Sequence, residues 1–298
     1  MEINQKNMFN IFKKKTEVVP SQKTTDEKIA QYLKSGKNAW SEGYVEYKEK
    51  SIISALDNIT LKTELISLKL SDNFGEGLDE RIIEYPWIFA NLKQLEGKEI
   101  LDAGSTFNFD FILKQEILMK NKITIATYAP ESPNYNHLGI SYVYTDLRET
   151  PFKDMFFDTV VSHSTIEHID MDNSIYGYDI THIEEEKKSY EYLLAIKEYL
   201  RILKSGGQLL LTFPFGKFEN HGFFQQFDSE MLERIIEILN PYGEIDSTFF
   251  QYKNKGWKFT TENDCANVVS FNPHTGKGKG DDGAAHCRSV CCINFIKK

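Results

Sequence analysis

A short apolar run that leads into an acidic residue and then a glycine constrains this chain most. Ile100 and Leu101 run straight into Asp102, and the chain turns at Gly104. The pattern predicts a buried parallel strand at residues 99–102, a ligand-binding turn, and a helix over residues 107–120. Open α/β sheets bind ligands at the carboxyl ends of their strands, and glycine allows close approach of the backbone. We therefore expect a cofactor at this turn, with the Asp102 carboxylate at the same rim.

The turn lacks the glycine pattern of dinucleotide sites. A pyrophosphate cradle needs G-x-G-x-x-G, whereas Gly104 is followed by Ser105, Thr106 and the bulky Phe107. A nucleoside without a pyrophosphate suits this turn better. The missing glycines count against a nicotinamide-dependent oxidoreductase, which stays an alternative.

From residue 98 onward, strand and helix patterns alternate, which is typical of a parallel sheet covered on both faces. Strands are predicted at residues 99–102, 123–127, 141–145, 157–162, 208–213, 245–252 and 290–296. Helices are predicted at residues 184–203, ending at a Ser-Gly-Gly turn, and at residues 231–239, where Asp228 is the N-cap. Upstream, residues 26–70 read as mostly helical, and residues 78–95 read as a helix interrupted at Pro86. We predict two units: a tail and helical cap at residues 1–77 and the sheet domain at residues 78–298.

Composition narrows the class of partner. The formal net charge is -9, which disfavours a nucleic-acid substrate because phosphate backbones attract basic surfaces. The four cysteines form no C-x-x-C pair, and Cys291 and Cys292 lie in an apolar run where we expect them to be packed. No segment has the apolar length of a membrane span or the pattern of a signal peptide. A reduced, cytoplasmic setting is the expectation.

Four segments, in order, resemble motifs of the class I S-adenosylmethionine-dependent methyltransferases. Residues 101–104 are similar to the first cofactor motif, and residues 144–147 to the motif whose acid, here Asp146, contacts the adenine amine. Residues 157–162, continuing to Glu167-His168, resemble the fourth strand and the pair that follows it. Residues 203–211 resemble the Leu-Lys-Pro-Gly-Gly turn and strand five, with Ser205 in place of proline. The resemblance implies a Rossmann-like sheet with an antiparallel last strand beside strand five, S-adenosylmethionine as methyl donor and S-adenosylhomocysteine as product.

The chain departs from this family at the end of strand two, where an acid usually holds the ribose hydroxyls. Here the strand ends in Thr127 and Tyr128, and the nearest acid is Glu131. Either Glu131 or the two hydroxyls substitute, or cofactor binding is weak. The resemblance implies these cofactor contacts: Asp102, Gly104, Ser105, Phe107, Glu131, Asp146, Leu147, Ser162 and His163.

The segment after strand four supplies the catalytic candidates, His163, Glu167 and His168. Imidazoles titrate near neutral pH and can remove the proton of an alcohol acceptor. Alternatively, His163 caps the following turn and Glu167 accepts backbone hydrogen bonds. Some family members bind a divalent metal here through Glu-x-x-Glu-His, but Ser164 replaces the first glutamate. We expect no metal, with His221 as a remote candidate ligand.

Two long segments are expected to wall the acceptor site, because insertions at the ligand face are commonly lids or substrate loops. The first, residues 170–188, carries Tyr176, Tyr178 and His182. The second, residues 215–227, carries Lys217 and His221. Residues 84–87, a Glu-Tyr-Pro-Trp run, are expected to pack over the cofactor site or at a proline kink.

These features favour a methyltransferase acting on a small polar acceptor: a sugar, a nucleotide-sugar or a polysaccharide precursor, with O-methylation preferred. The composition, rich in Lys, Asn and Ile, is typical of AT-rich bacterial genomes, in which such enzymes serve capsule or lipopolysaccharide synthesis. The alternative is a binding protein that kept the fold but lost catalysis. The missing acid at the end of strand two supports this alternative. A homodimer is a further expectation, and neither a nucleic-acid nor a membrane partner is expected.

Overall fold

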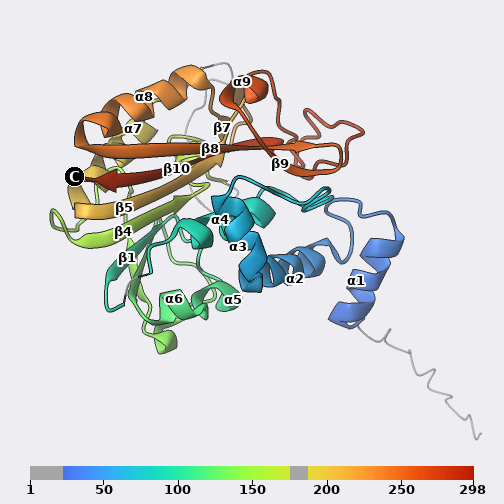
Figure 1. Ribbon diagram of the computed structural model, residues 1–298, viewed down its shortest axis with the longest axis horizontal. Helices are drawn as coiled ribbons and strands as arrows, with labels where there is room; N and C mark the ends of the chain where they lie inside the picture. The colour runs from blue at the N-terminus through green and yellow to red at the C-terminus, as the bar shows by residue number, and fades with distance from the viewer. Residues whose placement is uncertain (1–22, 95, 175–186) are drawn as a thin grey trace, which may run out of the picture.

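A computed structural model describes residues 23–94, 96–174 and 187–298, and its centre is an eight-stranded sheet (Figure 1). The first five strands in chain order run parallel to one another. In spatial order the strands are β3 (Ser141–Tyr144), β2 (Lys122–Thr127), β1 (Glu99–Ala103), β4 (Phe157–His163), β5 (Leu203–Pro214), β10 (Ser289–Lys297), β8 (Gly243–Lys253) and β9 (Gly256–Thr260).

The last strand confirms the predicted Rossmann-like methyltransferase sheet. β10 lies between β5 and β8 and is antiparallel to both, so β8 runs in the same direction as β5. β9 adds an antiparallel edge strand beyond β8, which the sequence pattern did not reveal. All the predicted strands exist, and their carboxyl ends from β1 to β5 share one edge of the sheet.

Helices cover both faces of this sheet (Figure 1). Four of them precede β1: α1 (Thr25–Lys34), α2 (Tyr44–Asp57), α3 (Ile59–Ile66) and α4 (Arg81–Asn91). The others are α5 (Asp110–Leu113), α6 (Glu116–Met119), α7 (Tyr192–Ile202), α8 (Ser229–Leu239) and α9 (Glu262–Cys265), with 3-10 turns η1 (Asn136–Leu138), η2 (Ile166–His168) and η4 (Asn240–Tyr242). A small two-stranded sheet, β6 (Glu219–Asn220) with β7 (Gln225–Gln226), follows β5.

Alternate residues of each central strand face two separate hydrophobic clusters, as the two-residue period of a strand requires. On β1, Ile100 belongs to the cluster that holds α2 to α6, whereas Leu101 belongs to the cluster that holds α7 and α8. On β10, Cys292 and Cys291 divide in the same way, and both are fully buried. The expectation that these two cysteines are packed is therefore confirmed.

The helical segment before β1 packs directly on the sheet. Tyr32 of α1 and Leu56 of α2 share one cluster with Ile100 and Val161 of the sheet. Thr24 and Glu27 close a reciprocal capping box at the start of α1. Residues 26–70 are mostly helical as expected, with turns at residues 35–43 and after residue 66, and the domain boundary at residue 77 stays a prediction. No helix in the described part of the chain has the length and apolar character needed to cross a bilayer.

Three predicted helices differ in the structure. α4 continues through Pro86 instead of breaking there, and Tyr85 and Trp87 on either side of the proline are buried in the core. The helix predicted over residues 107–120 is split into α5 and α6, because Gln115 adopts an extended conformation. The third, predicted over residues 184–203, is α7, which begins at Tyr192; residues 184–186 lie outside the described chain.

The Ser-Gly-Gly sequence at residues 205–207 lies in strand β5, not at a helix end as predicted. α7 ends at Ile202, and β5 begins at Leu203. Phe157 of β4 pairs with Leu203, but Thr159 pairs with Gln208, so the residues between them on β5 form a bulge. The prediction for α8 was correct, since the Asp228 side chain accepts a hydrogen bond from the Met231 amide at 3.1 Å.

Candidate active site

The turn after β1 contains a glycine at the point where it packs most closely against a neighbouring turn. Gly104 has φ +124°, and a Cβ placed on it would lie 2.0 Å from Oγ1 of Thr165. Thr165 follows β4, so the turn after β1 and the turn after β4 meet at this glycine. The Gly104 amide also donates to the Ala126 carbonyl at 2.9 Å. The glycine is therefore required by close packing as well as by its backbone conformation.

The Asp102 side chain accepts hydrogen bonds from the residues of this turn. Its Oδ2 accepts from the Phe107 amide at 2.7 Å, and its Oδ1 accepts from Oγ1 of Thr106 at 3.3 Å. Burial raises the pKa of Asp102 to about 7, despite these hydrogen bonds. The Phe107 ring is fully buried against Phe89, with 5.7 Å between ring centroids. Asp102 and Phe107 thus shape the turn from within the core.

Glu131 supplies an exposed carboxylate where strand two lacks an acid. Its Oε1 accepts from Oγ of Ser105 at 2.5 Å and from Oγ1 of Thr127 at 3.1 Å. Its Oε2 accepts from the side-chain amide of Asn108 at 3.3 Å. The Glu131 side chain therefore joins the end of β2 to the glycine turn, although it comes from the loop beyond Tyr128.

Asp146, after β3, is bound by Arg148. The guanidinium donates to Oδ2 at 2.7 Å from its NH2 nitrogen and to both carboxylate oxygens at 3.1 Å from Nε. Burial alone would raise the pKa of Asp146, but the hydrogen bonds from Arg148 outweigh burial and lower it. Leu147 is buried beside it. The Asp146 carboxylate is about one-third exposed, so it is accessible to a ligand from solvent.

The last two residues of β4 face opposite sides of the sheet. Ser162 is buried on the α7 side, where its hydroxyl lies 3.2 Å from the Tyr199 hydroxyl. His163 is buried on the α4 side, where its Nε2 lies 3.0 Å from Oε2 of Glu84. Both residues are predicted cofactor contacts, but the Ser162 side chain pairs with Tyr199 and the His163 side chain pairs with Glu84.

The Glu84 carboxylate is the centre of a buried network on α4. Besides His163, it accepts from Oγ of Ser164 at 2.6 Å and from Arg81 at 3.0 Å. Both Glu84 and His163 are fully inaccessible to solvent. The Tyr85 ring meets His163 edge-on at 4.5 Å between centroids. The segment at residues 84–87 therefore lies against the end of β4, next to the glycine turn, where the Tyr85 hydroxyl donates to the Thr106 carbonyl.

The surroundings of Glu84 and His163 lower the pKa values of both side chains. Burial would raise the pKa of Glu84, but His163 and Arg81 lower it to about 2. Burial, with the nearby Arg81 charge, lowers the pKa of His163. At neutral pH Glu84 is ionised and the imidazole is neutral, so Nε2–H donates to Glu84 and Nδ1 carries the lone pair. Nδ1 is buried and has no hydrogen-bond partner among the described residues.

Glu167 and His168 lie in η2, directly after this network. Burial holds the pKa of Glu167 well above its usual range, and its Oε2 has no partner among the described residues. Nδ1 of His168 lies 2.7 Å from the Phe223 carbonyl, and burial lowers the pKa of His168 to about 4. Nε2 of His168 is 4.0 Å from Oε1 of Glu167. Burial thus favours the neutral form of both side chains.

The predicted acceptor walls are partly described. Tyr176, Tyr178 and His182 lie outside the described residues. Lys217 is exposed after β5, and its backbone amide donates to the Val268 carbonyl at 2.9 Å. His221 is buried, with its ring stacked on Phe224 at 4.5 Å and its Nε2 3.3 Å from Oε2 of Glu219. Nδ1 of His221 has no partner among the described residues, and burial lowers the pKa of this histidine to about 4.

Phe223 and Phe224 bring the segment at residues 215–227 against η2. The His168 ring lies 5.9 Å from the Phe223 ring, and the His221 ring stacks on Phe224. The His286 ring also packs against Phe224, with 5.1 Å between ring centroids. His274 also packs edge-on against Phe223, with 5.3 Å between ring centroids, so four histidines gather around the two phenylalanines.

Sequence reasoning missed Glu80, Arg81, His286 and Cys287. Charged residues inside the otherwise apolar α4 were a readable signal, because Arg81 and Glu84 stand three positions apart on one face. His286 and Cys287 carried no such signal, since they precede β10 in an irregular segment.

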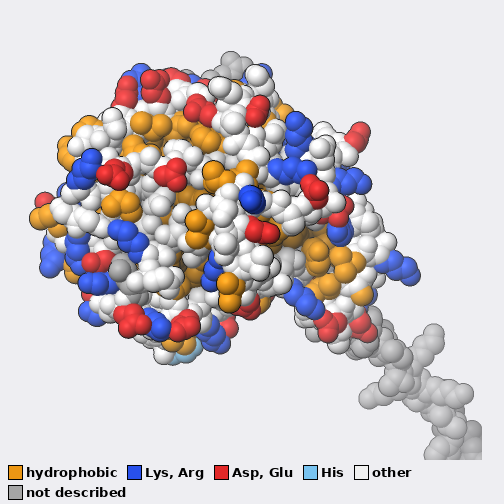
Figure 2. All heavy atoms as spheres, viewed as in Figure 1, with side chains coloured by type: hydrophobic (Ala, Val, Ile, Leu, Met, Phe, Trp, Pro, Cys, Tyr) orange, Lys and Arg blue, Asp and Glu red, His pale blue; other side chains and the backbone are white. Residues whose placement is uncertain are grey.

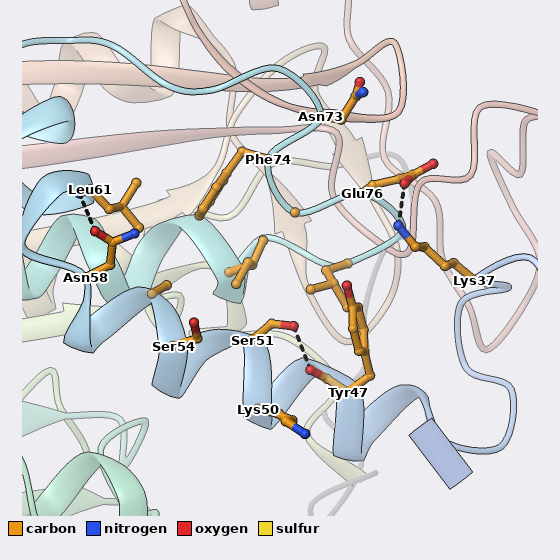
Figure 3. Close-up of a pocket in the computed structure, with 14 residues that line it drawn as sticks. Lys37, Tyr47, Lys50, Ser51, Ser54, Asn58, Leu61, Asn73, Phe74 and Glu76 are labelled. Atoms are coloured by element: carbon orange, nitrogen blue, oxygen red, sulfur yellow. Dashed lines mark hydrogen bonds and ion pairs between the residues drawn. The ribbon is translucent and has the colours of Figure 1, made fainter. Parts of the chain in front are cut away.

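One pocket lies away from these residues. A pocket of about 400 Å³ opens between α2, α3 and the loop at residues 73–78, and its lining contains none of the side chains above (Figure 3). There Lys37 pairs with Glu76 at 2.5 Å, and the Ser51 hydroxyl donates to the Tyr47 carbonyl at 2.7 Å. On the face drawn in Figure 2, acidic and basic side chains are interspersed over the described surface, as the net charge of -9 suggests.

Comparison with known proteins finds one family model and several solved structures that resemble part of this chain. A family model described as "Methyltransferase domain" matches residues 118–211, from the end of α6 into β5. No curated protein matches the chain. Similar solved structures include the 1,6-didemethyltoxoflavin-N1-methyltransferase of Burkholderia thailandensis, solved with S-adenosylhomocysteine (12% identity, 68% of this chain and 72% of that one, TM-score 0.39). Another is a SAM-dependent methyltransferase from Methanosarcina mazei (16% identity, 72% and 98%, TM-score 0.41). The family match places a methyltransferase domain within residues 118–211, on a sheet with the Rossmann-like strand order described above. This match supports a methyltransferase with S-adenosylmethionine as its cofactor.

Proposed function

We propose that this enzyme methylates a hydroxyl group of a small polar acceptor: a sugar, a nucleotide-sugar or a polysaccharide precursor. One observation carries the proposal. A buried, ionised Glu84 orients a neutral His163 whose Nδ1 lacks a partner among the described residues, at the end of β4 beside the glycine turn. A hydroxyl acceptor needs such a base, whereas an acceptor that is already an anion does not.

The cofactor residues fit an adenosyl group. The exposed Glu131 carboxylate and the Ser105 hydroxyl stand at the ends of β2 and β1, where they suit the ribose hydroxyls. Asp146 keeps a partly exposed carboxylate at the end of β3 for the adenine amine, which it would share with Arg148. S-adenosylmethionine supplies an electrophilic methyl group, so the protein has to align the acceptor and exclude water.

In the proposed reaction, His163 Nδ1 takes the acceptor proton as the new O–CH₃ bond forms. The S–CH₃ bond breaks at the same time, leaving S-adenosylhomocysteine, and the proton passes later to water. Glu84, 3.0 Å from Nε2, stabilises the imidazolium that forms. We assign His168 and Glu167 to the acceptor, with His221 and the two phenylalanines as the wall beside it.

The acceptor class rests on polarity and charge. The wall combines imidazoles with the Phe223 and Phe224 rings, a mixture that suits hydroxyl groups and the apolar face of a sugar ring. The net charge of -9 disfavours long polyanionic acceptors.

The test is a methyl-transfer assay with isotopically labelled S-adenosylmethionine against a panel of sugars and nucleotide-sugars. We expect labelled product from at least one of them, and we expect His163→Asn to lower its rate by about 10²–10⁴-fold. His137→Asn, at an exposed histidine in η1, is the matched control and should keep full activity. Full activity of the His163 variant, or transfer to none of the panel, would contradict the proposal.

A further inference from the structure

Three side chains of types that commonly bind transition metals meet next to the buried network around Glu84. Glu80 stands at the start of α4, and His286 and Cys287 lie just before β10. Nδ1 of His286 is 2.9 Å from Sγ of Cys287 and 3.3 Å from Oε1 of Glu80. One donor atom from each of the three lies within 4.8 Å of the others. Residues from the start of α4 and from the segment before β10 therefore form one compact set of donor atoms.

The spacing of these donors suits a metal ion. Zn²⁺ lies about 2.0–2.3 Å from imidazole, carboxylate and thiolate ligands, which places tetrahedral ligand atoms roughly 3.3–3.8 Å apart. The distance of 2.9 Å from His286 Nδ1 to Cys287 Sγ is shorter than this range, and the 3.3 Å to Glu80 Oε1 lies at its lower limit. A small outward movement of the side chains would therefore admit an ion at their centre.

The surroundings of the cluster hold more negative groups than cations. Glu80 and Glu84 are buried carboxylates, and Arg81 is the cation that pairs with Glu84. Buried carboxylates are costly unless they are paired, protonated or bound to a metal. Oε2 of the buried Glu167 has no partner among the described residues. This unsatisfied buried oxygen is an observation independent of the donor spacing.

The identity of the donors selects the metal. Mg²⁺ and Ca²⁺ prefer oxygen ligands, whereas a thiolate with an imidazole selects softer ions such as Zn²⁺. We propose that Glu80, His286 and Cys287 bind one Zn²⁺ ion, with a fourth coordination position left for water or an acceptor oxygen. This metal site stands on its own residues and does not depend on the acceptor class proposed above. It departs from the expectation that the chain uses no metal.

The experiment measures metal binding by the full chain without an affinity tag, since polyhistidine tags bind Zn²⁺ themselves. The protein is stripped with chelator, kept under a non-thiol reductant, titrated with ZnCl₂ by calorimetry and analysed for bound metal by mass spectrometry. We expect about one Zn²⁺ per chain, as for a three-ligand site. With CoCl₂ in place of ZnCl₂, we expect the charge-transfer absorption of a cobalt–thiolate bond.

Two variants locate the site. Cys287→Ser should abolish the cobalt–thiolate band, and Glu80→Gln should keep the band but weaken Zn²⁺ binding by at least about tenfold. Cys265→Ser is the matched control, because Cys265 is also a buried thiol and its neighbours Ser289 and Thr260 tolerate a hydroxyl. If Cys287→Ser fails to fold, Glu80→Gln and the wild-type spectrum still decide. Binding well below one ion per chain, a wild-type spectrum without the thiolate band, or unchanged Zn²⁺ affinity in Glu80→Gln would overturn the proposal.

Discussion

Two neighbouring regions of the ligand edge differ in how their polar groups are satisfied. The cofactor rim, at the ends of β1 to β3, contains Asp102, Glu131 and Asp146, and each carboxylate accepts hydrogen bonds from protein groups. The histidine corner, formed by Glu84, His163, Glu167, His168 and His221, contains three buried atoms without partners among the described residues. They are His163 Nδ1, Glu167 Oε2 and His221 Nδ1.

The difference suggests different tasks. A buried polar atom without a partner costs about 1–3 kcal/mol, so a fold rarely keeps several of them in one place without a use. In the proposed cofactor rim the carboxylates already have hydrogen-bond partners, so a ligand would share these donors and acceptors. The histidine corner, by contrast, has unmet hydrogen-bonding capacity, which a polar acceptor or an ion would satisfy.

The sharpest way to break this comparison is to remove one arginine-paired carboxylate from each region. Glu84→Ala leaves Arg81 and His163 without their buried partner and should cost about 3–5 kcal/mol of unfolding free energy. Asp146→Ala removes a partly exposed partner of Arg148 and should cost about 1 kcal/mol or less. Urea unfolding measures both, and equal losses would show that the two regions are not distinct in this way.

A second test uses the raised pKa of Asp102. Burial raises this pKa from 3.8 to about 7, so the folded state binds the proton more tightly than the unfolded state. The stabilisation is fully present below pH 4 and is lost as the pH rises through about 7; an order-of-magnitude conversion gives at most about 4 kcal/mol. Asp102→Asn should therefore flatten the fall in urea midpoint between pH 5 and pH 8. The same fall in wild type and variant would contradict the assignment.

A third test concerns the contact between the turns after β1 and β4. Gly104→Ala introduces a Cβ 2.0 Å from Thr165 Oγ1 at positive φ, whereas Gly139→Ala has positive φ but no atom within 4 Å. We expect a loss of about 2–3 kcal/mol for the first and about 1 kcal/mol for the second. Adding Thr165→Ala should recover part of the first loss. Thermal unfolding checks this, and equal losses in the two glycine variants would exclude a role for close packing.

The smallest effect is expected at the exposed acid of the cofactor rim. Glu131→Gln keeps a side-chain acceptor but loses the charge, so affinity for S-adenosylhomocysteine should fall about tenfold. Stability should stay within about 0.5 kcal/mol of wild type. Glu244→Gln, at an exposed position on β8, is the control. Unchanged affinity would leave the ribose hydroxyls to Thr127 and Tyr128, the other substitutes considered from the sequence.

Local patterns predicted most of the fold. The strands and the Asp228 cap follow from periodicity and turn chemistry within short windows. The antiparallel direction of β10 beside β5 was implied by the resemblance to class I methyltransferases. Where the prediction failed, tertiary packing prevailed: burial of Tyr85 and Trp87 keeps α4 helical across Pro86, and pairing with β4 draws residues 204–207 into β5 as a bulge.

The side-chain networks were less predictable. His163 was found from its place after a strand, but its partner Glu84 lies 79 residues earlier, on a helix whose orientation no local pattern determines. The same holds for Glu80 and Cys287, which are 207 residues apart. Glu131 was identified only because a motif was incomplete, and its contact with Ser105 depends on the path of the loop after β2.

The measurement that most directly tests the central claim is a calorimetric titration of the full chain with S-adenosylmethionine, S-adenosylhomocysteine and NAD. The account predicts micromolar binding of the first two ligands, at about one site per chain, and none of NAD. Binding of NAD alone would contradict the cofactor, and binding of none would contradict the proposal that the cofactor rim is organised to receive an adenosyl group.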